Sequence, residues 1–210
     1  MRGQAERIFG PIQLTPKRRL LQHYPDFAPV GPTCTCADMQ ELTAKKYAVF
    51  LDGPIGIGKT TYSKNLATEF TGHFIDGDDY SAPNLPWYAS SLSTNRHILN
   101  AILKALASAP IVFVAYPIRC TNWIFYQRRL RAQQVETVFI GLQANLSFIA
   151  DSSRSRRLSK TELRRSSEMI AQGYGRRAFS DFFVQADAGS ERYVTELAKV
   201  ALEKRILGGI

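Results

Sequence analysis

The chain has 210 residues, of which 45% are hydrophobic, and a formal net charge of +9 at pH 7. This length suits one α/β domain with an extension, and the hydrophobic fraction is enough for a packed core. No apolar run of about 18 residues occurs and residues 1–7 lack the apolar stretch of a signal peptide, so we expect no membrane segment and a cytoplasmic protein. Cys34 and Cys36 form a C-x-C and Cys120 is distant, a pattern that implies neither a disulfide framework nor a zinc site.

Residues 1–45 differ in composition from the rest of the chain. They contain several prolines and the basic triplet Lys17–Arg19. This composition predicts an N-terminal extension or loosely packed arm ahead of one folded domain over residues 46–210.

The first predicted strand, Tyr47–Asp52, leads directly into a G-x-x-x-x-G-K-T motif and a predicted helix over Lys59–Phe70. Glycines at this spacing let backbone N–H groups point at a β-phosphate, while the lysine reaches the β and γ oxygens and the threonine hydroxyl binds Mg²⁺. The helix N-terminus also favours an anion. We therefore predict an ATP and Mg²⁺ site formed by Gly53, Pro54, Ile55, Gly56, Ile57, Gly58, Lys59, Thr60 and Thr61.

The second predicted strand, His73–Asp76, ends in a carboxylate cluster. Ligands of open parallel sheets bind beyond the carboxyl ends of the strands, so this cluster should lie beside the phosphate loop. If the segment stays extended, Asp76 and Asp78 share a side and Asp79 points away. We assign Asp78 as the base or hydroxyl-orienting group and Asp76 as the metal helper beside Thr60. The alternative is an Asp-Gly turn that only caps the next loop.

Aromatic residues follow this cluster. Tyr80, Trp87 and Tyr88 are candidates to stack on a planar acceptor, and the alternative is that they close the core over the sheet edge. The next segment, Asn95–Ala107, has the spacing of a helix that faces the core. The third strand, Ile111–Tyr116, is almost wholly apolar, which is typical of a central strand covered on both faces.

Two further strands, Val135–Leu142 and Asp181–Gln185, complete the pattern. Between them lies a cationic stretch from Arg154 to Arg177 that contains only Glu162 and Glu168 as acids. Such a stretch can close over nucleotide phosphates, bind nucleic acid or be a solvated helix face, and its late position in the domain favours a lid. Strands alternating with helices predict an α/β fold with a parallel five-stranded sheet. The phosphate-loop motif resembles that of P-loop NTPases, and this resemblance implies a three-layer sandwich, here with a helical arginine lid.

From about Tyr47 to Leu202 the chain resembles the P-loop kinases of the nucleoside monophosphate kinase-like fold. The phosphate loop is similar to that of thymidine and other deoxynucleoside kinases, and Asp76-Gly-Asp78 is similar to the D-x-D of shikimate, gluconate and adenylylsulfate kinases. Asp78-Asp-Tyr80 is also similar to the acceptor-site sequence of polynucleotide 5′-hydroxyl kinases.

This resemblance implies roles for several arginines. Residues 153–165 are similar to the family's lid between two helices, expected at Asn145–Ala150 and Lys160–Gln172. Arg154 and Arg157 are chosen as its catalytic arginines because they share a helix face. Arg119 is the candidate to bind the acceptor, with a surface role as the alternative. The acid that deoxynucleoside kinases carry after the third strand is missing from Ala115–Arg119, which leaves Mg²⁺ to Thr60, water, phosphate oxygens and the Asp76/Asp78 pair.

These features predict a kinase that moves the γ-phosphoryl of Mg·ATP to a small acceptor, first of all a nucleoside or nucleotide. A polynucleotide 5′-kinase is the alternative, in which Lys17–Arg19 and the cluster Arg128, Arg129 and Arg131 would follow a phosphate backbone. The alternative outside enzymes is a nucleotide-binding switch module.

Overall fold

The computed structural model describes residues 45–81, 87–151, 153 and 156–207. Its sheet has five parallel strands in the order β2-β3-β1-β4-β5. The strands are β1 (Lys46–Asp52), β2 (His73–Asp76), β3 (Ile111–Ala115), β4 (Val135–Gln143) and β5 (Phe182–Gln185).

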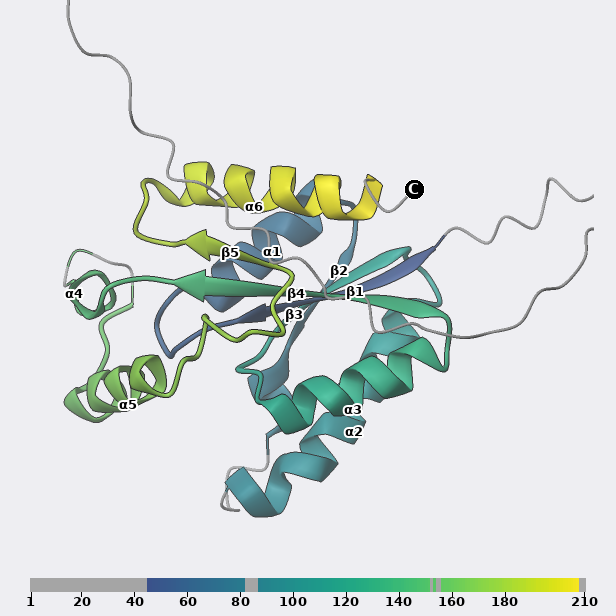
Figure 1. The fold of residues 1–210 in the computed structure, drawn as a ribbon, viewed down its shortest axis with the longest axis horizontal. Helices are drawn as coiled ribbons and strands as arrows, with labels where there is room; N and C mark the ends of the chain where they lie inside the picture. The colour runs from purple at the N-terminus through teal and green to yellow at the C-terminus, as the bar shows by residue number, and fades with distance from the viewer. Residues whose placement is uncertain (1–44, 82–86, 152, 154–155, 208–210) are drawn as a thin grey trace, which may run out of the picture.

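Helices cover both faces of the sheet (Figure 1). One face packs on α1 (Lys59–Glu69) and α6 (Glu191–Leu207), and the other on α2 (Trp87–Ala105) and α3 (Cys120–Arg131). The short α4 (Leu146–Ile149) and the longer α5 (Lys160–Ala171) lie beyond the ends of β4 and β5, and a 3₁₀ turn, η1 (Gly77–Tyr80), follows β2. The predicted three-layer α/β architecture is thus confirmed.

The central strand β1 shows why the layers form. Its side chains alternate between the faces: Val49 and Leu51 join the core under α1 and α6, whereas Ala48 and Phe50 join the core under α2 and α3. All four are fully buried. Because successive side chains of a strand point to opposite faces, a wholly apolar strand requires a covering layer on each side.

The strand predictions are confirmed to within one residue at either end. The helix predicted over Asn95–Ala107 matches the second half of α2, which begins earlier at Trp87 and ends at Ala105, with Ile98 and Ile102 fully buried. The helix predicted at Asn145–Ala150 is only a single turn, since both residues are its caps. The predicted extension over residues 1–45 lies outside the described residues except for Lys45.

All five strands run in one direction, so their carboxyl ends meet at one edge of the sheet. The segments after β1, β2 and β3 therefore gather there, together with α4 and α5 (Figure 1). No described helix is long and apolar enough to cross a bilayer.

Candidate active site

The phosphate loop connects β1 to α1 with two glycines in left-handed conformations. Gly56 has φ 79° and Gly58, which caps α1, has φ 110°. A Cβ on Gly56 would also meet Leu158 and Ile149, the side chains that cover the loop from the α4–α5 side. Both glycines are therefore required by the backbone, as the sequence predicts.

Lys59 reaches back over this loop. Its Nζ donates hydrogen bonds to the carbonyl oxygens of Gly53 at 3.0 Å and Pro54 at 2.9 Å. Desolvation lowers the pKa of the lysine, while the charges of Asp52, Asp78 and Asp76 act in the opposite direction. A cation enclosed by the loop and surrounded by carboxylates is placed to neutralise phosphate charge.

Thr60 and Asp76 meet beside the loop. The Thr60 hydroxyl donates to Asp76 Oδ2 at 3.0 Å, so the two residues predicted to hold Mg²⁺ are direct neighbours. A hydroxyl and a carboxylate are the hard oxygen donors that Mg²⁺ prefers. Among the described residues there is no group of three or more His, Cys, Asp and Glu that could hold a metal.

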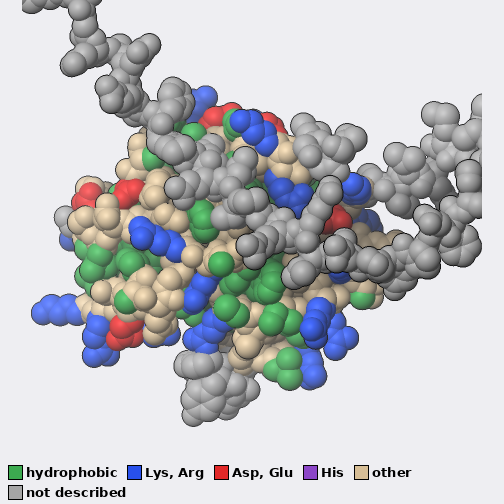
Figure 2. All heavy atoms as spheres, viewed as in Figure 1, with side chains coloured by type: hydrophobic (Ala, Val, Ile, Leu, Met, Phe, Trp, Pro, Cys, Tyr) green, Lys and Arg blue, Asp and Glu red, His purple; other side chains and the backbone are tan. Residues whose placement is uncertain are grey.

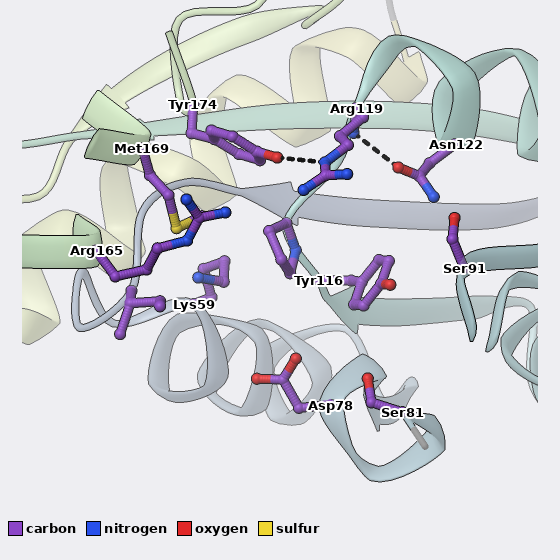
Figure 3. Close-up of a pocket in the computed structure, with 12 residues that line it drawn as sticks. Lys59, Asp78, Ser81, Ser91, Tyr116, Arg119, Asn122, Arg165, Met169 and Tyr174 are labelled. Carbon is purple, nitrogen blue, oxygen red and sulfur yellow. Dashed lines mark hydrogen bonds between the residues drawn. The ribbon is translucent and has the colours of Figure 1, made fainter. Parts of the chain in front are cut away.

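The segment after Asp76 is a helical turn rather than extended backbone. Asp76 Oδ1 accepts a hydrogen bond from the backbone N–H of Asp78 at 3.2 Å and so caps η1. The extended geometry expected for this segment is therefore wrong, because the Asp-Gly sequence forms a cap, the alternative that the sequence left open. The cap nevertheless turns Asp78 toward the phosphate loop (Figure 3).

Asp78 and Lys59 both line a cavity of about 310 Å³. Desolvation there raises the pKa of the carboxyl above its ordinary value, helped by the neighbouring Asp76, while Lys59 opposes the shift. A carboxylate with a raised pKa accepts a proton more readily. This is the property expected of a residue that orients or deprotonates an acceptor hydroxyl.

The rest of the cavity wall comes from distant parts of the chain. Figure 3 shows Arg119 and Arg165 pointing into the same space as Asp78. The lining also includes Ile55, Ser81, Ser91, Tyr116, Pro117, Asn122, Met169 and Tyr174. Sequence reasoning missed all of these except Ile55, since they lie in the turns after η1, β3 and α5 or on α2, α3 and α5, with no local motif that marks them.

Arg119, predicted to bind the acceptor, is held in place by its neighbours. Its Nε donates to the Tyr174 hydroxyl at 2.7 Å, and its backbone N–H donates to Asn122 Oδ1 at 3.0 Å. Tyr174 is buried, and the guanidinium of Arg177 lies over its ring, with Cζ 4.5 Å from the ring centroid. The arginine is therefore part of the cavity wall rather than a surface residue.

The aromatic residues after β2, predicted to stack on an acceptor, do not line the cavity where the structure describes them. Tyr80 is partly buried and packs on the core under α2 and α3, which supports the packing alternative rather than stacking on a ligand. The side chains of Trp87 and Tyr88 lie outside what the structure describes. The aromatic residues at the cavity are instead Tyr116 and Tyr174.

The arginines of the predicted lid that lie near the cavity are not the two chosen from helical spacing. Arg154 lies outside the described residues, and Arg157 is exposed. Arg156 forms an ion pair with Glu162, and its charge lowers the pKa values of both Lys59 and Asp78. Residues 156–159, directly before α5, are not helical, and the i, i+3 relation of Arg157 to Arg154 lies outside the described residues.

Helix α5 itself is fastened to the phosphate loop. Ser166 Oγ donates to the carbonyl of Ile55 at 2.9 Å, and Ser159 and Glu162 cap the helix start reciprocally. This contact brings Arg165, one residue before Ser166, to the cavity. Ion pairs with Glu162 and Glu168 offset part of the basic stretch, and Figure 2 shows Lys and Arg scattered over the visible face.

The other basic cluster lies elsewhere. Arg128 and Arg131 are exposed at the end of α3 and line a separate cavity with the beginning of β4 at Val135. The amino ends of parallel strands are at the opposite edge of the sheet from the phosphate loop. Lys17–Arg19, the other half of this predicted backbone-binding surface, lies outside the described residues.

Comparisons with known proteins identify the fold. No protein-family model matches the chain, and no curated protein matches its sequence. A gluconokinase from Sinorhizobium meliloti 1021 superposes with a TM-score of 0.58 and 16% identity over 79% of this chain and 95% of that one. An APS kinase of Mycobacterium tuberculosis, solved with AMPPNP and APS, superposes with a TM-score of 0.55 and 13% identity over 76% of this chain and 98% of that one.

A sugar kinase from Janibacter sp. HTCC2649 gives a TM-score of 0.55 and 16% identity over 76% of this chain and 95% of that one. The chain has the P-loop kinase fold. At these identities the likeness concerns the fold alone, and the similarity of the phosphate loop to thymidine kinases is not shown by it. What the protein does therefore has to be argued from the site.

Proposed function

We propose that the protein is an ATP-dependent kinase that transfers the γ-phosphoryl group of Mg·ATP to a hydroxyl of a small acceptor. The observation that supports this best is that one cavity is lined by Lys59 of the phosphate loop, by Asp78 and by Arg119. A phosphate-binding lysine beside a candidate base is the arrangement that in-line phosphoryl transfer requires.

The chain's own residues have defined parts in this reaction. The phosphate loop and Lys59 bind the β- and γ-phosphates, and Thr60 with Asp76 would hold Mg²⁺, which supplies charge neutralisation between the phosphates. Asp78 accepts the proton of the acceptor hydroxyl. The oxygen of that hydroxyl forms a bond to the γ-phosphorus, and the bond between the γ-phosphorus and the β–γ bridging oxygen breaks. Arg165 faces the same space and can offset developing charge.

The cavity restricts the acceptor. Its volume of about 310 Å³ is at the small end of the range for ligand sites, which fits a small molecule rather than a polymer within it. Arg119 suits an anionic or strongly polar group of the acceptor, and Tyr116 and Tyr174 offer ring surface. A nucleoside or nucleotide is the first class to test, and a sugar acid is the second because a structure of this fold is a gluconokinase.

An acceptor screen tests the proposal directly. The full chain would be incubated with Mg²⁺, γ-labelled ATP and thymidine, deoxycytidine, AMP, D-gluconate, APS or a 5′-hydroxyl oligonucleotide, and labelled product would be measured. We expect transfer to one of the small molecules. Transfer to none of the panel, with ATP bound at Lys59, would favour a nucleotide-binding module instead.

Salt separates the polymer alternative from the small-molecule proposal. A single-molecule pocket predicts a shallow dependence of acceptor KM on ionic strength, whereas contact with several backbone phosphates makes affinity fall steeply as salt rises. Preferential transfer to the oligonucleotide with a steep slope would therefore overturn the small-molecule proposal.

A further inference from the structure

Asp52 is a fully buried carboxylate at the end of β1, directly before the first residue of the phosphate loop. It does not line the cavity. Its two oxygens accept hydrogen bonds from two different loops: Oδ1 from the backbone N–H of Ile118 at 2.8 Å, and Oδ2 from that of Gly175 at 3.0 Å. Sequence reasoning gave this residue no role beyond the end of a strand.

Each of these two backbone groups is next to a residue of the cavity wall. Ile118 precedes Arg119, and Gly175 follows Tyr174. Arg119 and Tyr174 are themselves joined by the 2.7 Å hydrogen bond between Nε and the phenol hydroxyl. One carboxylate thus fixes the backbones of both members of a pair that meets at the acceptor end of the cavity.

The surroundings of Gly175 leave little freedom to replace this contact. Its φ of 78° is left-handed, and a Cβ there would collide with the carbonyl oxygen of Leu142 and lie 3.6 Å from the Cα of Gly53. The loop therefore passes close to the phosphate loop, and Asp52 and Gly175 are both buried there. Only a carboxylate offers two oxygen acceptors to two N–H donors at once, since an asparagine has a single oxygen.

The charge on Asp52 also has partners. Burial raises its pKa, while the two backbone hydrogen bonds and the charges of Lys59 and Arg177 lower it. The guanidinium of Arg177 lies over the Tyr174 ring, on the same loop. The carboxylate thus interacts electrostatically with both Lys59 of the nucleotide site and Arg177 of the loop that carries Tyr174.

We propose that Asp52 is a positioning residue that sets Arg119 and Tyr174 against the phosphate loop, so that the acceptor is held in line with the γ-phosphate. This inference rests on the proposed kinase function. It assigns Asp52 no contact with substrate. It predicts that loss of the carboxylate raises the KM of the acceptor more than the KM of ATP.

The test compares Asp52→Asn, Tyr174→Phe and the double variant with wild type. Asp181→Asn is the matched control, because Asp181 is another buried carboxylate that accepts a backbone N–H, that of Phe139 at 2.9 Å, away from the cavity. Acceptor KM and ATP KM are measured with whichever molecule of the named panel wild type phosphorylates. Amide hydrogen exchange of Ile118 and Gly175 is measured on the protein with AMPPNP.

For Asp52→Asn we expect acceptor KM to rise about tenfold or more, the scale of a lost buried hydrogen bond, with ATP KM changed less than about threefold. Amides of the two loops should exchange faster, and those of Ala48–Leu51 should not. The double variant should be less impaired than the product of the single effects, because both substitutions release the same pair. Asp181→Asn should leave both KM values near wild type.

Two results would overturn the inference: unchanged acceptor KM in Asp52→Asn, or equal losses in acceptor and ATP KM with multiplicative effects in the double variant. Failure of the proposed function is distinguishable, since wild type would then transfer phosphate to no panel molecule. In that event unchanged exchange of the Ile118 and Gly175 amides in Asp52→Asn would overturn the positioning of the loops, and faster exchange would support it.

Discussion

The two ends of the cavity are built in different ways. The nucleotide end is one continuous segment, Gly53–Thr61, whose glycine conformations and helix N-terminus make a phosphate site from backbone groups. The acceptor end is assembled from side chains on five separate segments, including η1, the turn after β3, α5 and the loop at Tyr174. A backbone site is defined by local sequence, whereas a side-chain site exists only where the fold brings its parts together.

This difference has an electrostatic consequence. At the nucleotide end Lys59 is balanced by Asp52, Asp76 and Asp78, so its charge is shared among neighbours before a ligand arrives. At the acceptor end the Arg119 side chain donates a hydrogen bond to the phenol hydroxyl of Tyr174. Substitutions at the two ends should therefore separate ATP use from acceptor use, and the following predictions test that separation.

The largest effect is expected from Lys59→Ala. Loss of the cation over the phosphates should lower transfer by about 10³-fold or more, the scale of a lost transition-state charge partner, with the fold intact. Steady-state transfer and circular dichroism measure this. Lys64→Ala is the control, because Lys64 lies on the same helix but faces the Phe74 ring. Turnover near wild type in Lys59→Ala would contradict the kinase proposal.

Asp78→Asn should impair turnover of the acceptor far more than binding of ATP. We expect kcat to fall by about 10²- to 10⁴-fold, as for a lost general base, with ATP KM little changed. The raised pKa of Asp78 also predicts that wild-type activity falls with decreasing pH at a value above that of an ordinary aspartate, since protonation removes the base. The variant should lack this acidic limb. Asp79→Asn should be near wild type, and equal behaviour of the two variants would require another base.

Asp76→Asn tests the metal assignment at the nucleotide end. Removal of the carboxylate beside the Thr60 hydroxyl should raise the Mg²⁺ concentration for half-maximal activity by about 10- to 100-fold, with partial recovery at high Mg²⁺. Titration of activity with Mg²⁺ at fixed ATP measures this. A loss of activity that Mg²⁺ does not restore would assign Asp76 to η1 capping instead.

The smallest effect is expected from the lid. Arg165→Ala should lower kcat/KM by about tenfold, as for one hydrogen bond to a charged group. Arg164→Ala should have little effect, because that side chain is 78% exposed whereas Arg165 lines the cavity. Initial rates of the two variants over a range of acceptor concentrations at saturating ATP measure the difference in kcat/KM. Equal effects would show that the α5 cations act only through overall charge.

Local sequence determined the nucleotide end and the sheet. The spacing of Gly53, Gly56 and Gly58 fixes the loop, since the left-handed conformations at Gly56 and Gly58 and the following helix leave few other outcomes. Apolar runs such as Ile111–Ala115 locate the strands, because a strand buried on both faces has no polar positions. The adjacency of Thr60 and Asp76 also followed from the rule that strand ends meet at one edge.

Only the tertiary structure decided which side chains face the acceptor. Arg165 reaches the cavity because Ser166 is bonded to Ile55, and Tyr174 meets Arg119 because Asp52 holds both loops. The two residues in each of these contacts are separated by between 55 and 123 positions in the sequence, so no local propensity encodes the contacts. The cap formed by Asp76 likewise replaced the expected extended segment, since a side-chain hydrogen bond to the Asp78 N–H favours a turn over a continued strand.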